Sequence, residues 1–149
     1  MSELRRPITK RTLNAWLKEQ RRGGAPAWPL YIRLSDIQRQ SENLDEMLVL
    51  AEAMRSIEDE IVDRNLKGIE LEKHGKEEEA KLLYEANVAD CFDGSHPYDR
   101  LRIIYKYRGD NPNAIRVCEA YIRNSGQDPK LCESYRAEIA KLKLKMESQ

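Results

Sequence analysis

Along most of the chain, apolar residues recur at intervals of three and four, the spacing that predicts amphipathic α-helices. The first helical stretch is TKRTLNAWLKEQRRGG, in which Leu13, Trp16 and Leu17 share one face and two glycines stop the helix. The segment APAWP then predicts a linker, because two prolines within four residues disfavour a helix on either side of them. From Pro29 onward the helical spacing resumes, and it predicts two helices separated by a break near Ser41.

The middle of the chain marks its helix boundaries with a cap and a turn. Ser56, followed three residues later by Asp59, has the spacing of a capping box. A helix is therefore predicted over about 57–74, and Gly75 stops it. The segment KEEEAKLLYEANVADCF has helical spacing again and predicts the partner of that helix.

Three further helices are predicted after this pair. Beyond the loop DGSHP, Pro97 fits the first turn of a helix, where a proline loses no intrahelical hydrogen bond, and Gly109 stops that helix. The segment DNPNAIRVCEAYI predicts a helix capped by Asn111. Asp128 caps a last helix, which extends over 128–147.

Small residues in this region repeat at a fixed interval. Gly109 lies 34 residues after Gly75, and Ala114 lies 34 residues after Ala80. The same shift pairs further residues of like character: Ile69 with Ile103, Leu71 with Tyr105, Leu83 with Val117, and Ala86 with Ala120. The sequence therefore predicts that one helix–turn–helix unit occurs twice.

A 34-residue period of helix, tight turn and helix resembles the tetratricopeptide repeat, in which a small residue of the second helix lets the first helix pack closely. Ala80 and Ala114 match that small residue, and Gly75 and Gly109 match the turn. The resemblance covers about residues 61–124. It implies an all-α fold of antiparallel helical hairpins, stacked as a short solenoid with a C-terminal capping helix.

This interpretation divides the chain into two parts. Residues 1–24 form a basic N-terminal amphipathic helix or arm, and residues 25–149 form the helical-repeat domain. Within the domain, 61–94 and 95–124 are the tetratricopeptide-like pairs, and 128–147 is the capping helix.

The last helix has one apolar stripe, made of Leu131, Tyr135, Ile139, Leu142 and Met146. Its other face is polar, as expected of a helix that covers the open end of a stack. A strict stripe also suits pairing with the same helix of a second chain. Capping and dimerisation therefore both stay open.

Charge is distributed unevenly along the 149 residues. The net charge is zero, but residues 1–23 contain seven Lys and Arg against two Glu. A basic arm of this kind gives salt-sensitive binding to phosphates with little sequence information. It makes nucleic acid an alternative partner, with Arg5, Arg6, Lys10 and Arg11 as the candidate contacts.

Several other classes of protein find no support in the sequence. No apolar run approaches the about 18–20 residues that span a bilayer, and the N-terminus lacks the apolar core of a secretion signal. We therefore expect a cytoplasmic protein without membrane contact. The three cysteines, Cys91, Cys118 and Cys132, are an odd number without CxxC spacing, so reduced thiols are expected.

Chemistry-bearing patterns are equally scarce. Neither a glycine-rich phosphate loop nor a nucleophile elbow nor an HExxH pattern occurs. Cys91 and His96 lack the second close pair that would complete a zinc site. We expect no metal, no cofactor and no enzymatic activity.

Surface binding is the function that the resemblance implies. In tetratricopeptide arrays the first helices of successive pairs line a concave groove, which places these residues there: Asn65, Ile69, Glu72, Lys73, His96, Asp99, Ile103, Lys106 and Tyr107. Such a groove holds a partner's helix or extended peptide. The expected function is a non-enzymatic adaptor or accessory subunit that binds another protein. A groove filled by the protein's own N-terminal helices is an equal alternative.

Overall fold

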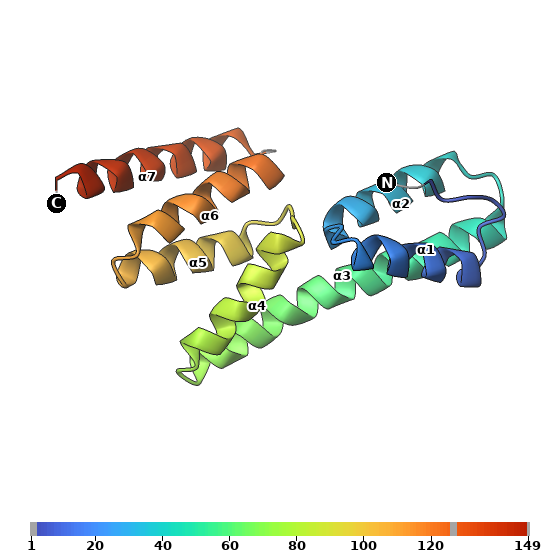
Figure 1. The fold of residues 1–149 in the computed structure, drawn as a ribbon, viewed down its shortest axis with the longest axis horizontal. Helices are drawn as coiled ribbons and strands as arrows, with labels where there is room; N and C mark the ends of the chain where they lie inside the picture. The colour runs from blue at the N-terminus through green and yellow to red at the C-terminus, as the bar shows by residue number, and fades with distance from the viewer. Residues whose placement is uncertain (1–2, 126–127, 149) are drawn as a thin grey trace. The chain divides into compact units, whose positions relative to one another are not determined.

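The computed structural model describes residues 3–125 and 128–148, and within these ranges the fold is all-α, as the sequence predicts (Figure 1). Seven helices follow one another in the described part of the chain: α1 (Lys10–Arg22), α2 (Ala27–Gln40), α3 (Leu44–Lys73), α4 (Glu77–Ala89), α5 (His96–Tyr107), α6 (Asn111–Asn124) and α7 (Pro129–Glu147).

The chain divides into two compact units, Met1–Val62 and Asp63–Gln149. The division falls inside α3, so this helix contributes its first part to one unit and its last part to the other. The boundary predicted after residue 24 therefore does not coincide with the division of the structure. Helix α1 belongs to the first unit together with α2.

The first unit has its own apolar core. Its buried members come from α1, α2, α3 and the segment before α1: Ile8, Leu13, Trp16, Leu30, Leu34 and Leu50. Thr9 caps α1 through a reciprocal pair of hydrogen bonds with Thr12, which fixes the start of the helix. Leu17 and Ile37 pack against this core from its edge. The apolar faces of α1 and α2 are thus used within the first unit.

The second unit is built around α4, α5, α6 and α7. Helix α5 packs between α4 and α6, and α7 packs on α6, as Figure 1 shows. The buried core of this unit contains five tyrosines, namely Tyr84, Tyr98, Tyr105, Tyr121 and Tyr135. Tyr121 lies edge-on to Tyr98 and stacks on Tyr135, so aromatic contacts connect α5, α6 and α7.

Glycine makes the turns at the ends of α3 and α5. Gly75 and Gly109 both have a φ of 73°, in the left-handed region that glycine adopts without a steric cost. Each lies two residues after the end of a helix and two residues before the start of the next. The two alanines that follow, Ala80 and Ala114, are completely buried.

The linker predicted at APAWP is wrong, because α2 begins at Ala27 with Pro26 as its N-cap. Pro29 is the third residue of the helix. Amides in the first turn have no intrahelical acceptor, so a proline at that position costs no hydrogen bond. The break predicted near Ser41 is confirmed, since Ser41 is the C-cap of α2.

The helix start predicted at Ser56 is also wrong. Helix α3 runs without interruption from Leu44 to Lys73, so the first predicted pair begins well before residue 61. The reason is the continuous apolar spacing through Leu50, Ile57 and Ile61, which keeps one helix in contact with the core on both sides of the serine. A serine inside a helix is tolerated when tertiary packing favours the helix.

Caps of the last two helices differ in how well the sequence predicts them. Helix α6 is capped by Asp110, whose carboxylate accepts from the Asn113 amide, so the predicted cap at Asn111 is one residue too late. Helix α7 is capped by Asp128 as predicted. Along α7, the first four residues of the apolar stripe pack in the second unit, while Met146 is exposed.

Candidate functional site

The predicted groove residues lie on the last part of α3 and on α5, and an ion pair between Glu72 and Arg100 connects these two helices. The Arg100 guanidinium binds both oxygens of the Glu72 carboxylate, at 2.6 and 3.1 Å. The Tyr84 hydroxyl donates to the same carboxylate at 2.6 Å. Burial alone would raise the pKa of Glu72, but the hydrogen bonds from Arg100 and Tyr84 outweigh it and hold the pKa below its usual value.

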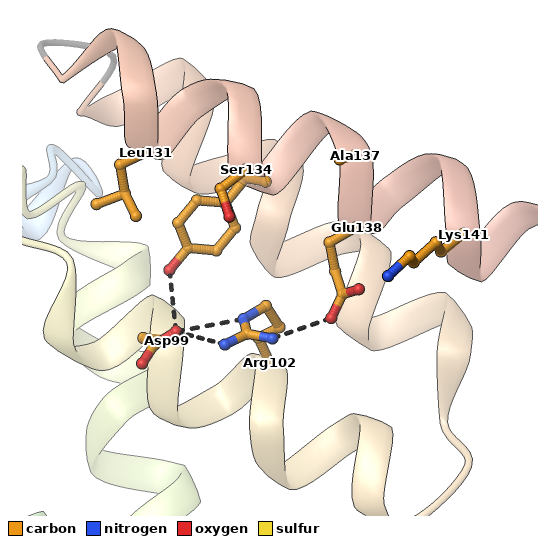
Figure 2. Close-up of a pocket in the computed structure, with 8 residues that line it drawn as sticks. Asp99, Arg102, Leu131, Ser134, Ala137, Glu138 and Lys141 are labelled. Carbon is orange, nitrogen blue, oxygen red and sulfur yellow. Dashed lines mark hydrogen bonds and ion pairs between the residues drawn. The ribbon is translucent and has the colours of Figure 1, made fainter.

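A second set of ion pairs connects α5 to α7 (Figure 2). Arg102 is held by Asp99 on its own helix at 2.7 Å and by Glu138 of α7 at 2.9 Å. Lys106 pairs with the same Glu138 carboxylate. Burial of Glu138 opposes ionisation, yet Lys106 and Arg102 together keep its pKa below the usual value. Two predicted residues, Asp99 and Lys106, thus belong to an ionic connection between helices.

A pocket lies between these helices, bordered by Asp99 and Arg102 of α5 and by one face of α7. The α7 residues of that border are Leu131, Ser134, Tyr135, Ala137, Glu138 and Lys141. Arg102 lies over the Tyr135 ring at 5.8 Å, so the guanidinium is fixed by a cation–π contact as well as by its carboxylates.

Sequence reasoning missed Arg100, Arg102 and Glu138 as members of this site. The signal that could have indicated Arg102 is a break in the repeat. Arg102 lies 34 residues after Gly68, and a large cation replaces a glycine there because the two positions have different neighbours. A Cβ at Gly68 would lie 2.6 Å from the Tyr84 ring, so only glycine fits there. Arg102 has its side chain directed to α7 instead.

Asn65 is used inside the α3–α4 hairpin. The Asn87 side-chain amide donates to the side-chain Oδ1 atom of Asn65 at 2.9 Å. Arg64 beside it pairs with the buried Asp90 at 2.6 Å and also donates to Asn87. This polar network fastens α4 to α3, which is a structural role for a predicted binding residue.

The other predicted residues differ in exposure. Ile69 and Ile103 are half-buried, whereas Lys73 is exposed. Tyr107 is 92% exposed at the end of α5 and is the most exposed large hydrophobic residue among those that the structure describes.

His96, the first residue of α5, is enclosed by charged and aromatic groups. Its ring lies edge-on to Tyr84, with centroids 5.5 Å apart, and its Nε2 atom is buried without a hydrogen-bond partner. Burial and the nearby Arg100 lower the pKa of His96, which outweighs the opposing effect of Glu72 and Asp99. The ring is therefore neutral at pH 7.

This environment predicts an acid-sensitive contribution to stability. The unfolded chain binds a proton on this ring near the ordinary pKa of about 6.5, whereas the folded protein binds it only at lower pH. The contribution is present above the unfolded pKa and is lost as the pH falls through it toward the folded pKa. The variant His96→Phe keeps the aromatic contact but cannot bind the proton. When the pH is lowered from about 7.5 to about 5.5, we expect its free energy of unfolding to fall less than that of the parent.

Denaturant unfolding at the two pH values measures the effect. The matched control is His74→Gln, because His74 is the other of the two histidines and lies exposed beside Glu70. A parent and a His96→Phe variant with the same loss of stability would show that His96 does not titrate in this range.

The candidate nucleic-acid contacts at the N-terminus are partly engaged by acidic side chains. Arg6 pairs with Glu46 at 3.3 Å, and Lys10 pairs with Glu52 at 3.2 Å. Both acids lie on α3 in the same unit. Arg5 and Arg11 are exposed. Two of the four predicted cations therefore have protein carboxylates that compete with phosphate.

The described residues contain no group of three or more His, Cys, Asp or Glu side chains placed to hold a metal ion. Cys118 and Cys132 are buried free thiols, Cys91 is a half-buried one, and burial raises the pKa of Cys118 to about 12. Within the same residues, no helix combines the length and the apolar composition that crossing a membrane requires.

Comparisons of the chain with protein-family models, with curated proteins and with solved structures find no match.

Proposed function

We propose that this chain is a non-enzymatic protein–protein interaction module, a small cytoplasmic adaptor or accessory subunit built on two tetratricopeptide-like helical pairs. Its binding surface is the interaction face, defined as Ile69, Lys73, Ile103, Lys106 and Tyr107. The partner contributes a helix or an extended segment that lies along this face.

The repeat interpretation is supported by local geometry. Gly75 and Gly109, 34 residues apart, share the same left-handed conformation, and Ala80 and Ala114 are equally buried. In an arrangement of this kind the first helices of the pairs are α3 and α5. The Glu72–Arg100 pair, which connects these two helices, supports their placement side by side.

Tyr107 is the observation that carries the proposal. Around the axis of α5, Ile103 and Tyr107 lie on the face between two arginines. Arg100, on one side of that face, binds α3, and Arg102, on the other side, binds α7. A tyrosine gives a partner a large contact area for the loss of few side-chain rotations. Because the ring is 92% exposed, it contributes little to the fold and is available for binding.

The alternative of a groove filled by the protein's own N-terminal helices has less support. Leu13, Trp16 and Leu30 are buried in the core of the first unit, and Leu17 and Ile37 pack against it. An apolar face that is buried in one core has little area left to fill another groove.

Tyr107→Ala is therefore expected to weaken capture of the native partner about tenfold, or on the order of 1.4 kcal/mol. Capture is measured with the tagged full chain in an extract of the source cells, by quantitative mass spectrometry. The matched control is Leu82→Ala on α4, because Leu82 is also a large, exposed apolar residue but lies outside the interaction face. Equal capture by the parent and by Tyr107→Ala would contradict the proposal.

Nucleic-acid binding by the N-terminal arm remains the alternative function. The cluster of basic residues before α2 favours it, and the ion pairs of Arg6 and Lys10 with acids of α3 count against it. In the capture experiment, this alternative predicts that nuclease treatment, rather than the Tyr107 substitution, removes the bound protein.

A further inference from the structure

We propose that the pocket between α5 and α7 binds an acidic side chain of the partner segment, with Lys141, Arg102 and Ser134 as its contacts. The inference rests on the proposed function and specifies the chemistry of the partner. It follows from the balance of charges within the pocket, from unused hydrogen-bond donors and from the charge of the two helices that form it.

The acids of the pocket are already neutralised, whereas one of its cations is not. Asp99 is paired with Arg102, and Glu138 is shared by Arg102 and Lys106. Among the described residues, no carboxylate pairs with Lys141, and Figure 2 shows its amine pointing toward the Glu138 end of the pocket. With Lys106 included, three cations face two carboxylates, so one further carboxylate balances the site.

Hydrogen-bond donors for that carboxylate are available at the same place. The Arg102 guanidinium has five N–H groups and uses three of them, two toward Asp99 and one toward Glu138. The Ser134 hydroxyl borders the pocket on the α7 side. A carboxylate accepts several such bonds at once, and charge-assisted bonds of this type are the strong ones.

The charge of the surrounding surface favours a partner segment with several acidic residues over one with a single acidic side chain. Helices α5 and α7 together carry eight Lys and Arg against four Asp and Glu, a net charge of +4. The second unit as a whole is neutral, with sixteen residues of each sign. The positive charge is therefore concentrated on the two helices that form the pocket, which complements a negatively charged partner.

The position of Lys141 on α7 favours a bound peptide over a buried ion. The α7 residues of the pocket that follow Ser134 at three, four and seven positions are Ala137, Glu138 and Lys141, so all four line one face of the helix. Lys145 follows one turn later and is exposed. A segment that runs along α7 thus meets two cations in succession.

The test uses the full chain and a fluorescent hexaglutamate peptide, acetylated and amidated so that only side-chain carboxylates are present. Lys141→Gln is expected to weaken binding of this peptide about tenfold. The matched control is Lys143→Gln, which removes the same charge from the same helix at an exposed position outside the pocket. We expect this control to change the affinity less than twofold, and hexaglutamine to bind neither protein.

A second variant places the competing carboxylate within the chain. Ala137→Glu puts an acid four residues before Lys141, the favourable order for an ion pair within a helix. We expect it to weaken hexaglutamate binding as much as Lys141→Gln does, with the helix content unchanged. Both variants retain Arg102 and Glu138, so the connection between α5 and α7 is preserved.

Equal losses in Lys141→Gln and Lys143→Gln, or no saturable binding of the peptide, would overturn the assignment of the pocket. Tighter, Lys141-dependent binding of single-stranded DNA would overturn it in favour of phosphate. If hexaglutamate does not bind while Tyr107→Ala still weakens capture of the native partner, only the proposed preference for an acidic partner is wrong. If both experiments fail, the proposed function is wrong as well.

Discussion

Tyr84→Ala is expected to lower the free energy of unfolding by about 3–5 kcal/mol. Tyr84 is completely buried in the core of the second unit. Its ring fills the space above Gly68 and contacts His96, and its hydroxyl donates to Glu72. The substitution leaves a cavity among α3, α4 and α5 and removes a hydrogen bond from a carboxylate.

Urea denaturation followed by circular dichroism measures this effect. Tyr107→Ala is the control, since it removes the same side chain from an exposed position and is expected to stay within about 0.5 kcal/mol of the parent. Similar unfolding of the two variants would contradict the described packing of Tyr84.

Ala80→Leu and Ala114→Leu are each expected to cost about 1–3 kcal/mol, because three added carbon atoms overpack a filled core. Both alanines are completely buried, on α4 and α6. They lie 34 residues apart at the positions where the proposed repeat requires close contact between the helices of a pair. The two costs should therefore be similar.

Thermal unfolding of the two variants provides the measurement, and Ala89→Leu is the control, because Ala89 is exposed at the end of α4. The register of the proposed repeat would be wrong if both variants melted like the parent. A large cost at only one position would show that the two pairs do not pack alike.

Helix ends were predictable where one residue decides the local geometry. Gly75 and Gly109 adopt the left-handed conformation that glycine favours, and Asp128 caps α7 through its own carboxylate. These signals act over two or three residues. Their effect is visible in the sequence without knowledge of distant contacts.

The same local reasoning failed where packing decides the outcome. Ser56 and Asp59 have the spacing of a cap, but the apolar residues on either side bury one continuous face, and α3 is a single helix of 30 residues. The linker predicted around Pro29 is wrong for a related reason, because this proline lies in the first turn of α2. A proline signals an interruption only when its position lies beyond the first turn.

The ion pairs of the candidate site could not be predicted from sequence alone. Glu72 and Arg100 are 28 residues apart, and Arg102 and Glu138 are 36 residues apart. A helical surface rich in both charges offers many such combinations, and only the packing of the helices selects among them. Asp99 and Lys106, two of the residues predicted to line the groove, take part in such pairs, with Arg102 and with Glu138.

Tyr107→Ala, with partner capture and thermal unfolding recorded on the same protein, tests the central claim most directly. If the interaction face binds another protein, capture falls about tenfold while the melting temperature equals that of the parent. If the face is covered by the chain's own residues, truncating Tyr107 lowers the melting temperature and leaves capture intact. That second pattern would contradict the proposed function.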